Sequence, residues 1–264
     1  MTPVPFVAPT SIVRRIWGDA DVMLLIFAGA SAEFALNKAV DWLFFTGKLP
    51  ADPIGRLFST VTYAQQLVFA SQADAHRTLA QITFIHRGVE TKRGYAIPDW
   101  AYRDVLYMLI DYSERAFACL HRPLTPAERA ELFAVFEQVG QGMGIPDLPG
   151  TYADWQTDRQ AHLQADLARS AFTDALFRRY AEALGSWRFA LLRQAQGLLI
   201  PPPVARLLPT PRPWLGRCLW LYGVVNALGM RRLMQRILLP TAYLAQIRVL
   251  DRTATPELFP QGET

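Results

Sequence analysis

The chain has 264 residues, of which 51% are hydrophobic and 19% are charged, and its formal net charge is +4. This length suits one large domain, and the modest charge, carried mostly by scattered arginines, argues against a nucleic-acid-binding protein. The two cysteines, Cys119 and Cys218, are too few for a disulfide framework or a cysteine metal site, so we expect a reducing, cytoplasmic compartment.

Helical spacing of apolar residues dominates the sequence, and strand signals are scarce, which predicts an all-α fold. After Ser11, a capping residue, residues 12–45 read as helical, with a break expected near Gly29–Ala30. The next helix opens at Asp52 and runs to about residue 70, because Pro53 suits the first turn of a helix.

A third helix is predicted over Asp74–Glu90, and it carries His76 and His86. Its apolar positions recur at steps of three and four residues, as expected for one buried stripe. These positions are Leu79, Ile82, Ile85 and Val89. A long helix then follows from Asp99 to about residue 120.

The second half continues with a helix near Thr125, where Glu128 completes a capping box. Residues 152–184 predict one or two helices, and a segment with six prolines follows at 201–213. Beyond it we expect two amphipathic helices to about residue 243. The domain would therefore span residues 1–250, with a flexible tail over 251–264.

Generic catalytic signatures such as a phosphate loop or a nucleophile elbow are absent, which directs attention to the histidines. His86 lies mid-helix among bulky apolar neighbours. A single imidazole on an apolar helix is what a proximal haem ligand requires, because the ring supplies one Fe–N bond while its surroundings exclude water. The alternative is a buried histidine that is hydrogen-bonded to a carbonyl.

Five short segments occur in a characteristic order along residues 10–245. They are Asp52-Pro-Ile-Gly-Arg-Leu-Phe-Ser-Thr60, Ile85-His-Arg-Gly-Val89, Tyr95-Ala-Ile-Pro-Asp99, Leu124-Thr-Pro-Ala-Glu128 and Gly144-Ile-Pro146. In this order and spacing the chain resembles the family of MpaB-type oxygenases and rubber oxygenases (latex clearing proteins). No single segment is specific to the family, but the ordered set is.

The resemblance implies an all-α domain that encloses a haem b, with His86 as the axial iron ligand. It also implies that Arg56 and Thr60, four residues apart on one helix face, help to hold the haem. Rubber oxygenases have a lysine between them that can reach the iron, and this chain has Ser59 there, which is too short to do so. A His-Pro pair of the family's first core helix is replaced here by Ala30-Ser31.

Glu33, Asn37 and Asp41 recur every four residues, so they would share one face of a helix over 31–45. As catalytic groups they would point at the oxygen-binding side, with Asn37 donating a hydrogen bond to bound dioxygen and an acidic neighbour moving a proton. The alternative is a solvated helix face with Lys38 beside it.

The resemblance implies a haem b-dependent oxygenase that uses dioxygen on a hydrophobic, isoprenoid-like substrate. One alternative is a haem-binding or peroxidase-like protein that is not an oxygenase, and another is a haem-free helical lipid-binding protein. The basic, aromatic segment 214–240 could make a peripheral membrane contact, or it could pack in the core.

Overall fold

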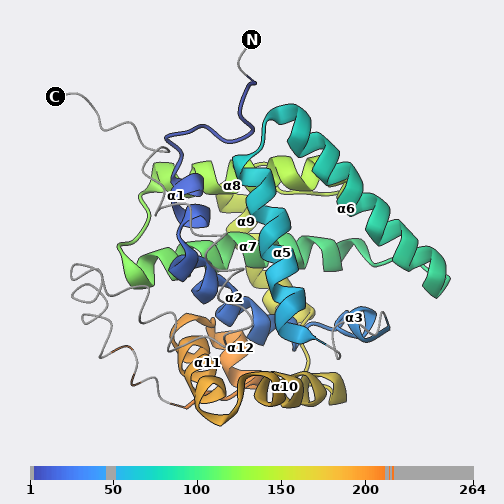
Figure 1. Cartoon of the computed structure of the whole chain (residues 1–264), viewed down its shortest axis with the longest axis vertical. Helices are drawn as coiled ribbons and strands as arrows, with labels where there is room; N and C mark the ends of the chain where they lie inside the picture. The colour runs from blue at the N-terminus through green and yellow to red at the C-terminus, as the bar shows by residue number, and fades with distance from the viewer. Residues whose placement is uncertain (1–2, 46–51, 212–213, 215, 217–264) are drawn as a thin grey trace.

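The computed structural model describes residues 3–45, 52–211, 214 and 216 of the chain; the side chains of residues 43, 53, 56–59 and 61 lie outside this description. Within these residues every regular element of secondary structure is a helix. Two isolated β-bridges also occur, one from Pro5 to Ser71 and one from Asn37 to Leu167. The helices surround one main hydrophobic core (Figure 1), so the predicted all-α single domain is confirmed.

The N-terminal part forms α1 (Ile12–Gly18), α2 (Ala20–Phe34) and the short α3 (Asp41–Phe45). The break predicted near Gly29–Ala30 is wrong, because α2 continues through both residues. The chain instead breaks at Asp19, whose carboxylate accepts a hydrogen bond from the Asp21 amide and so caps α2. The glycine at position 29 serves close packing, since a side chain there would overlap the Tyr112 ring.

The predicted second and third helices are α5 (Pro53–Phe69) and α6 (Gln72–Arg93), which are joined by a tight corner. The α5 N-terminus is capped by Asp52, as the Asp-Pro pair predicts. Helix α6 begins earlier than predicted because Ser71 accepts a hydrogen bond from the Asp74 amide. It ends at Gly94, which adopts a positive φ of 84° and so stops the helix.

Six more helices complete the described fold. The capping box at Thr125 and Glu128 is present, and residues 152–184 form two helices. A helix after Gly185 and a short helix inside the proline-rich segment were not predicted. The six are α7 (Asp99–Leu120), α8 (Pro126–Met143), α9 (Tyr152–Ala165), α10 (Ala171–Leu184), α11 (Ser186–Leu199) and α12 (Pro202–Leu207).

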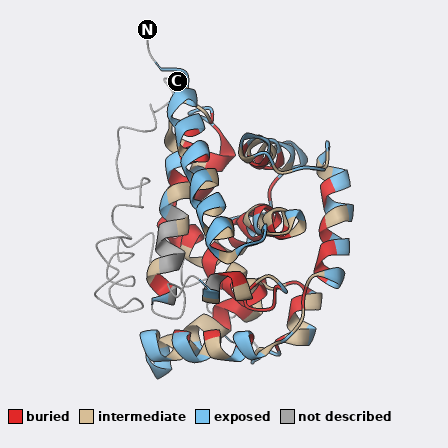
Figure 2. Ribbon diagram, turned by 90° about the vertical axis from the view of Figure 1, so that its right-hand side faces the viewer, coloured by how far each residue is buried: buried red, intermediate tan, exposed pale blue. Residues whose placement is uncertain are grey.

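Helix α2 lies at the centre of the fold because nearly all of its faces are apolar, and it packs chiefly against α7 and α11. Figure 2 shows the buried residues gathered on the inner faces of the helices, while the outer faces are exposed. The largest fully buried side chains come mostly from α1, α2 and α7, among them Trp17, Tyr107, Tyr112 and Phe117. This packing fixes α2 and α7, two of the helices that carry the polar groups described below.

The two amphipathic helices predicted up to residue 243 lie almost wholly outside the described residues, as does the predicted tail 251–264. Among the helices that are described, none combines the length and the hydropathy that crossing a bilayer requires.

Candidate functional site

Helix α6 carries His86 on the face that turns toward the rest of the protein. The imidazole is half-buried, and Ile82 and Val89, one turn away on either side, are half-buried as well. Leu79 of the predicted stripe is fully buried, whereas Ile85 is 41% exposed and lies at the edge of this face. His76, by contrast, is exposed. His86 is thus the histidine of α6 that lies in partly apolar surroundings.

Tyr102 of α7 holds its ring edge-on to the His86 imidazole, with the ring centroids 5.2 Å apart. Its hydroxyl donates a hydrogen bond of 3.2 Å to Glu90 Oε1, and the same oxygen accepts a hydrogen bond from the Ile97 amide. Burial, together with the Glu90 charge, raises the pKa of Tyr102 well above its ordinary value, so the phenol stays protonated. Tyr102 therefore limits the positions open to the imidazole.

The other residues assigned to the haem by resemblance belong to α5. Arg56 and Thr60 lie four residues apart on this helix, as predicted, and Thr60 is half-buried. The side chains of Arg56 and Ser59 lie outside the described part of the chain. Their contribution to a haem site therefore remains a prediction.

The structure does not place Glu33, Asn37 and Asp41 on one helix face, so that prediction is wrong. Helix α2 ends at Phe34, Asn37 lies in a turn that bridges to Leu167, and Asp41 begins α3. The alternative of a solvated face is also wrong for two of them, since Glu33 and Asn37 are buried. The four-residue spacing of the three polar residues is compatible with one helix, but the helix ends at Phe34 and the chain turns before Asp41.

Asp41 forms an ion pair with Arg93, the last residue of α6, two turns beyond His86. The Arg93 guanidinium also stacks on the ring of Trp42, 4.0 Å from its centroid, and on Tyr95, 4.7 Å away. Asp41 is therefore the one of the three predicted catalytic residues that contacts the helix carrying His86.

Glu33 belongs to a buried ion network between α2, α7 and α9. Arg159 donates hydrogen bonds of 2.6 and 2.7 Å to the two Glu33 carboxylate oxygens, and it also donates to Asp111 Oδ2 at 3.0 Å. The Tyr112 hydroxyl donates to Glu33 Oε2 at 2.9 Å. Burial opposes the Arg159 charge, but Glu33 and Asp111 outweigh it and raise the pKa of Arg159, so the guanidinium stays charged.

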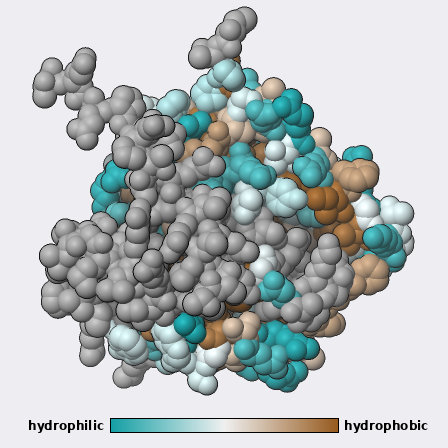
Figure 3. Space-filling view, in the orientation of Figure 1, coloured by the Kyte–Doolittle hydropathy of each residue, from teal (hydrophilic) through white to brown (hydrophobic). Residues whose placement is uncertain are grey.

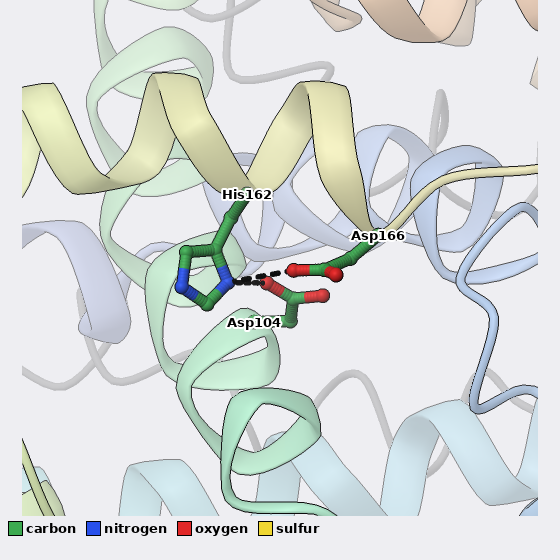
Figure 4. A group of neighbouring side chains, drawn as sticks. All are labelled: Asp104, His162 and Asp166. Atoms are coloured by element: carbon green, nitrogen blue, oxygen red, sulfur yellow. Dashed lines mark hydrogen bonds and ion pairs between the residues drawn. The ribbon is translucent and has the colours of Figure 1, made fainter.

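A second buried cluster lies next to it, centred on His162 of α9 (Figure 4). His162 Nδ1 lies 2.5 Å from Asp104 Oδ1 and 3.1 Å from Asp166 Oδ2. The Asn37 amide donates a hydrogen bond of 2.6 Å to the other Asp104 oxygen. Burial opposes the imidazolium, but the hydrogen bond and the charge of Asp104 raise the pKa of His162 above its ordinary value.

The Asp104, His162 and Asp166 ligand atoms all lie within 4.8 Å of one another, and their types suit a divalent metal. The imidazole already pairs directly with the carboxylates, so the described contacts account for the cluster as an ion-pair network. We call the two clusters together the polar layer; its members are Glu33, Asn37, Asp104, Asp111, Arg159, His162 and Asp166.

Sequence reasoning missed most of the polar layer. Asp104 and Asp111 are seven residues apart on α7, and Arg159 and His162 are three apart on α9, so each pair shares one helix face. Between the two aspartates the helix is apolar, and most of its side chains are buried, although Val105 is exposed. Ionisable residues at helical spacing inside an apolar helix were the signal that could have found these residues.

The sequence profile of one protein family, described as "ER-bound oxygenase mpaB/B'/Rubber oxygenase, catalytic domain", matches residues 14–240. This range includes every residue of the polar layer and the whole of α6. No curated protein and no solved structure matches the chain at a significant level.

Proposed function

The chain belongs to the mpaB and rubber oxygenase family, and on this basis we propose that it is a haem b-dependent oxygenase acting on a hydrophobic, isoprenoid-like substrate. Oxygenase-type activity follows from the family. The haem, its ligand and the substrate are our proposal, and His86 is the residue on which the proposal rests.

The observation that carries the proposal is the half-buried imidazole of His86 on the inner face of α6. An imidazole suits ferrous and ferric iron, and Ile82 and Val89 would limit access of water to the bond. Figure 3 shows hydrophobic surface over the middle of α6, where Phe84 and Ile85 are exposed. Apolar surface beside the site is compatible with an oily substrate.

The residues described around His86 fit a haem in their chemistry. Thr83, one turn before His86, has a buried hydroxyl oxygen without a hydrogen-bond partner among the described residues. A buried polar group without a partner is costly, so a further polar group bound at this face would be stabilised. Haem propionates are groups of this kind, and the guanidinium of Arg56 would suit them equally.

Bound haem would supply dioxygen binding and activation at its iron. His86 would hold the iron through one ring nitrogen, and Tyr102 would keep the ring in a fixed orientation through its edge-on contact. Thr60 and Arg56 would hold the haem from α5. Ser59 is too short to bind the iron, so at this position the chain would offer no second protein ligand to compete with dioxygen.

The catalytic roles of Glu33, Asn37 and Asp41 remain predictions. Asp41 contacts α6 through its ion pair with Arg93, so of the three it is linked directly to the helix that would hold the haem. Glu33 and Asn37 are buried and hydrogen-bonded in the polar layer, where they hold α2 against α7 and α9. In the proposed enzyme Glu33 and Asn37 would position the helices through these hydrogen bonds.

An absorption spectrum of the full chain loaded with haem tests the proposal. We expect an intense Soret band, its loss or shift in His86→Ala, and no change in His76→Ala, since His76 is exposed on the same helix. Oxygen consumption with squalene, an oligoisoprene, then tests the oxygenase. A spectrum that does not change in His86→Ala would contradict the assignment of the ligand.

The same measurements separate the alternatives. Iron with two protein ligands that does not bind carbon monoxide would favour a haem-binding protein that is not an oxygenase. A chain that takes up no haem at all would favour a lipid-binding protein.

A further inference from the structure

A groove of about 550 Å³ lies along the outer face of α11, which Figure 1 draws at the lower end of the molecule, away from α6. One wall is a stripe of α11 at helical spacing, formed by Trp187, Ala190, Leu191 and Gln194. The other wall is the chain after α12, at Pro211 and Trp214. A groove of this size can take a lipid-sized molecule.

The second wall is fixed to α11 by specific contacts. The Trp214 amide donates a hydrogen bond of 2.8 Å to Gln194 Oε1, and Arg193 Nη2 donates one of 2.8 Å to the Pro209 carbonyl. Thr210 and Pro211 pack against Gly197, where a larger side chain would be crowded. Pro209 and Trp214 are therefore each held against α11 by a hydrogen bond.

The groove is apolar but has positive charge at its edge. Arg193 lines it and donates to neutral acceptors, the Gln196 side chain and the Pro209 carbonyl. Arg188, stacked on Trp187, forms no ion pair with any acidic residue in the described part of the chain, and neither does Arg193. Nearby acids such as Asp174 and Glu182 are already paired with Arg169 and Arg179.

We propose that this groove binds a long-chain carboxylate, the anion of a fatty acid, with the acyl chain along α11 and the carboxylate on Arg193. A guanidinium offers two parallel N–H donors to a carboxylate, and such charge-assisted bonds are among the strongest in proteins. The rings of Trp187 and Trp214, each about half exposed, gain buried area when a chain lies between them.

None of the described residues that line the groove belongs to α5 or α6, so the proposal does not depend on the haem. Its ligand site is distinct from the His86 face, and a failure of haem binding would leave it untouched.

Fluorescence titration of the full chain with 11-bromoundecanoate tests the proposal, because bromine quenches tryptophans that it contacts. We expect saturable quenching that decreases in both Trp187→Phe and Trp214→Phe. Ala190→Phe, which fills the groove from an exposed position, should weaken binding about tenfold or more. Arg193→Gln should weaken it similarly, because a charge-assisted hydrogen bond is lost.

Two controls make the result decisive. Arg178→Gln removes an exposed arginine of the neighbouring α10 and should leave the affinity unchanged. The neutral 11-bromoundecanol should bind about tenfold more weakly than the carboxylate.

Unchanged binding by Ala190→Phe would overturn the proposal, even if Arg193→Gln proved unstable through loss of its Pro209 contact. Equal affinity for the alcohol would overturn the role of Arg193. Quenching by bromolipid vesicles but not by dissolved 11-bromoundecanoate would show that this face contacts a lipid surface. It would overturn the proposal that the groove binds a single fatty acid anion.

Discussion

Arg159 of α9 and Glu33 of α2 are 126 positions apart in the sequence, yet they form two parallel hydrogen bonds in the core. Both side chains are almost fully buried, at 3% and 2% exposure. Taking two charges out of water is costly, and this geometry with the added bonds to Asp111 and Tyr112 offsets that cost. The pair joins the central helix to α9.

Removing one partner of this pair should destabilise the protein strongly. Arg159→Met leaves the Glu33 charge buried and uncompensated, so the free energy of unfolding should fall by about 3–5 kcal/mol. In the double variant Glu33→Gln/Arg159→Met the Glu33 charge is gone, Gln can still accept from Tyr112, and Asp111 keeps its ion pair with Arg115, so much of the loss should be recovered. Urea unfolding measures both.

The matched control is Arg179→Gln, since Arg179 pairs with Glu182 on the surface of α10 with both side chains exposed. Its effect should stay below about 0.5 kcal/mol. A double variant less stable than Arg159→Met would show that the ion pair itself, and not the stranded charge, dominates.

The His162 cluster predicts a dependence of stability on pH. Because the folded pKa of His162 lies above the unfolded value of about 6.5, the folded state binds a proton more tightly. Its stabilising contribution is complete below pH 6.5 and is lost as the pH rises through the folded pKa. The difference in free energy of unfolding between the wild type and His162→Gln should therefore shrink from pH 6 to pH 9.

Urea unfolding of both proteins at each pH gives this difference directly. The comparison removes the contribution of the other titrating groups, which both proteins share. A difference that is constant over this range would mean that His162 does not gain its proton on folding.

The sequence predicted much of the helical framework but little of the polar layer. Local signals were sufficient for α5 and α8, where Asp52 and Thr125 cap the first turns. They failed at Gly29, because the glycine is required there by the close approach of the Tyr112 ring on α7 and not by the local backbone conformation. Glu33 and Arg159 meet only through tertiary packing, which no spacing within one helix reveals.

The Tyr102 ring should orient His86, and two substitutions distinguish the effect of the ring from the effect of its hydroxyl group. Tyr102→Phe removes only the hydrogen bond to Glu90. Because the edge-on ring stays, the Soret band of the haem-loaded chain should change little. Tyr102→Ala removes the ring and should weaken haem affinity about tenfold or more, as loss of a group that orients a ligand does. Equal affinities in the two variants would show that the ring has no positioning role.

Two glycines inside helices should respond to alanine in opposite directions. At Gly29 the added methyl group would overlap the Tyr112 ring, so α2 and α7 must separate, and the free energy of unfolding should fall by about 1–3 kcal/mol. At Gly88 of α6 the methyl group meets open space, so alanine should stabilise the helix by about 0.5–1 kcal/mol.

Urea unfolding of Gly29→Ala and Gly88→Ala under the same conditions checks the pair, and each variant is the control for the other. Helix propensity favours alanine equally at both positions, so a difference in sign can come only from packing. If Gly29→Ala were also stabilised, the close contact between α2 and α7, on which the geometry of the polar layer depends, would not exist in solution.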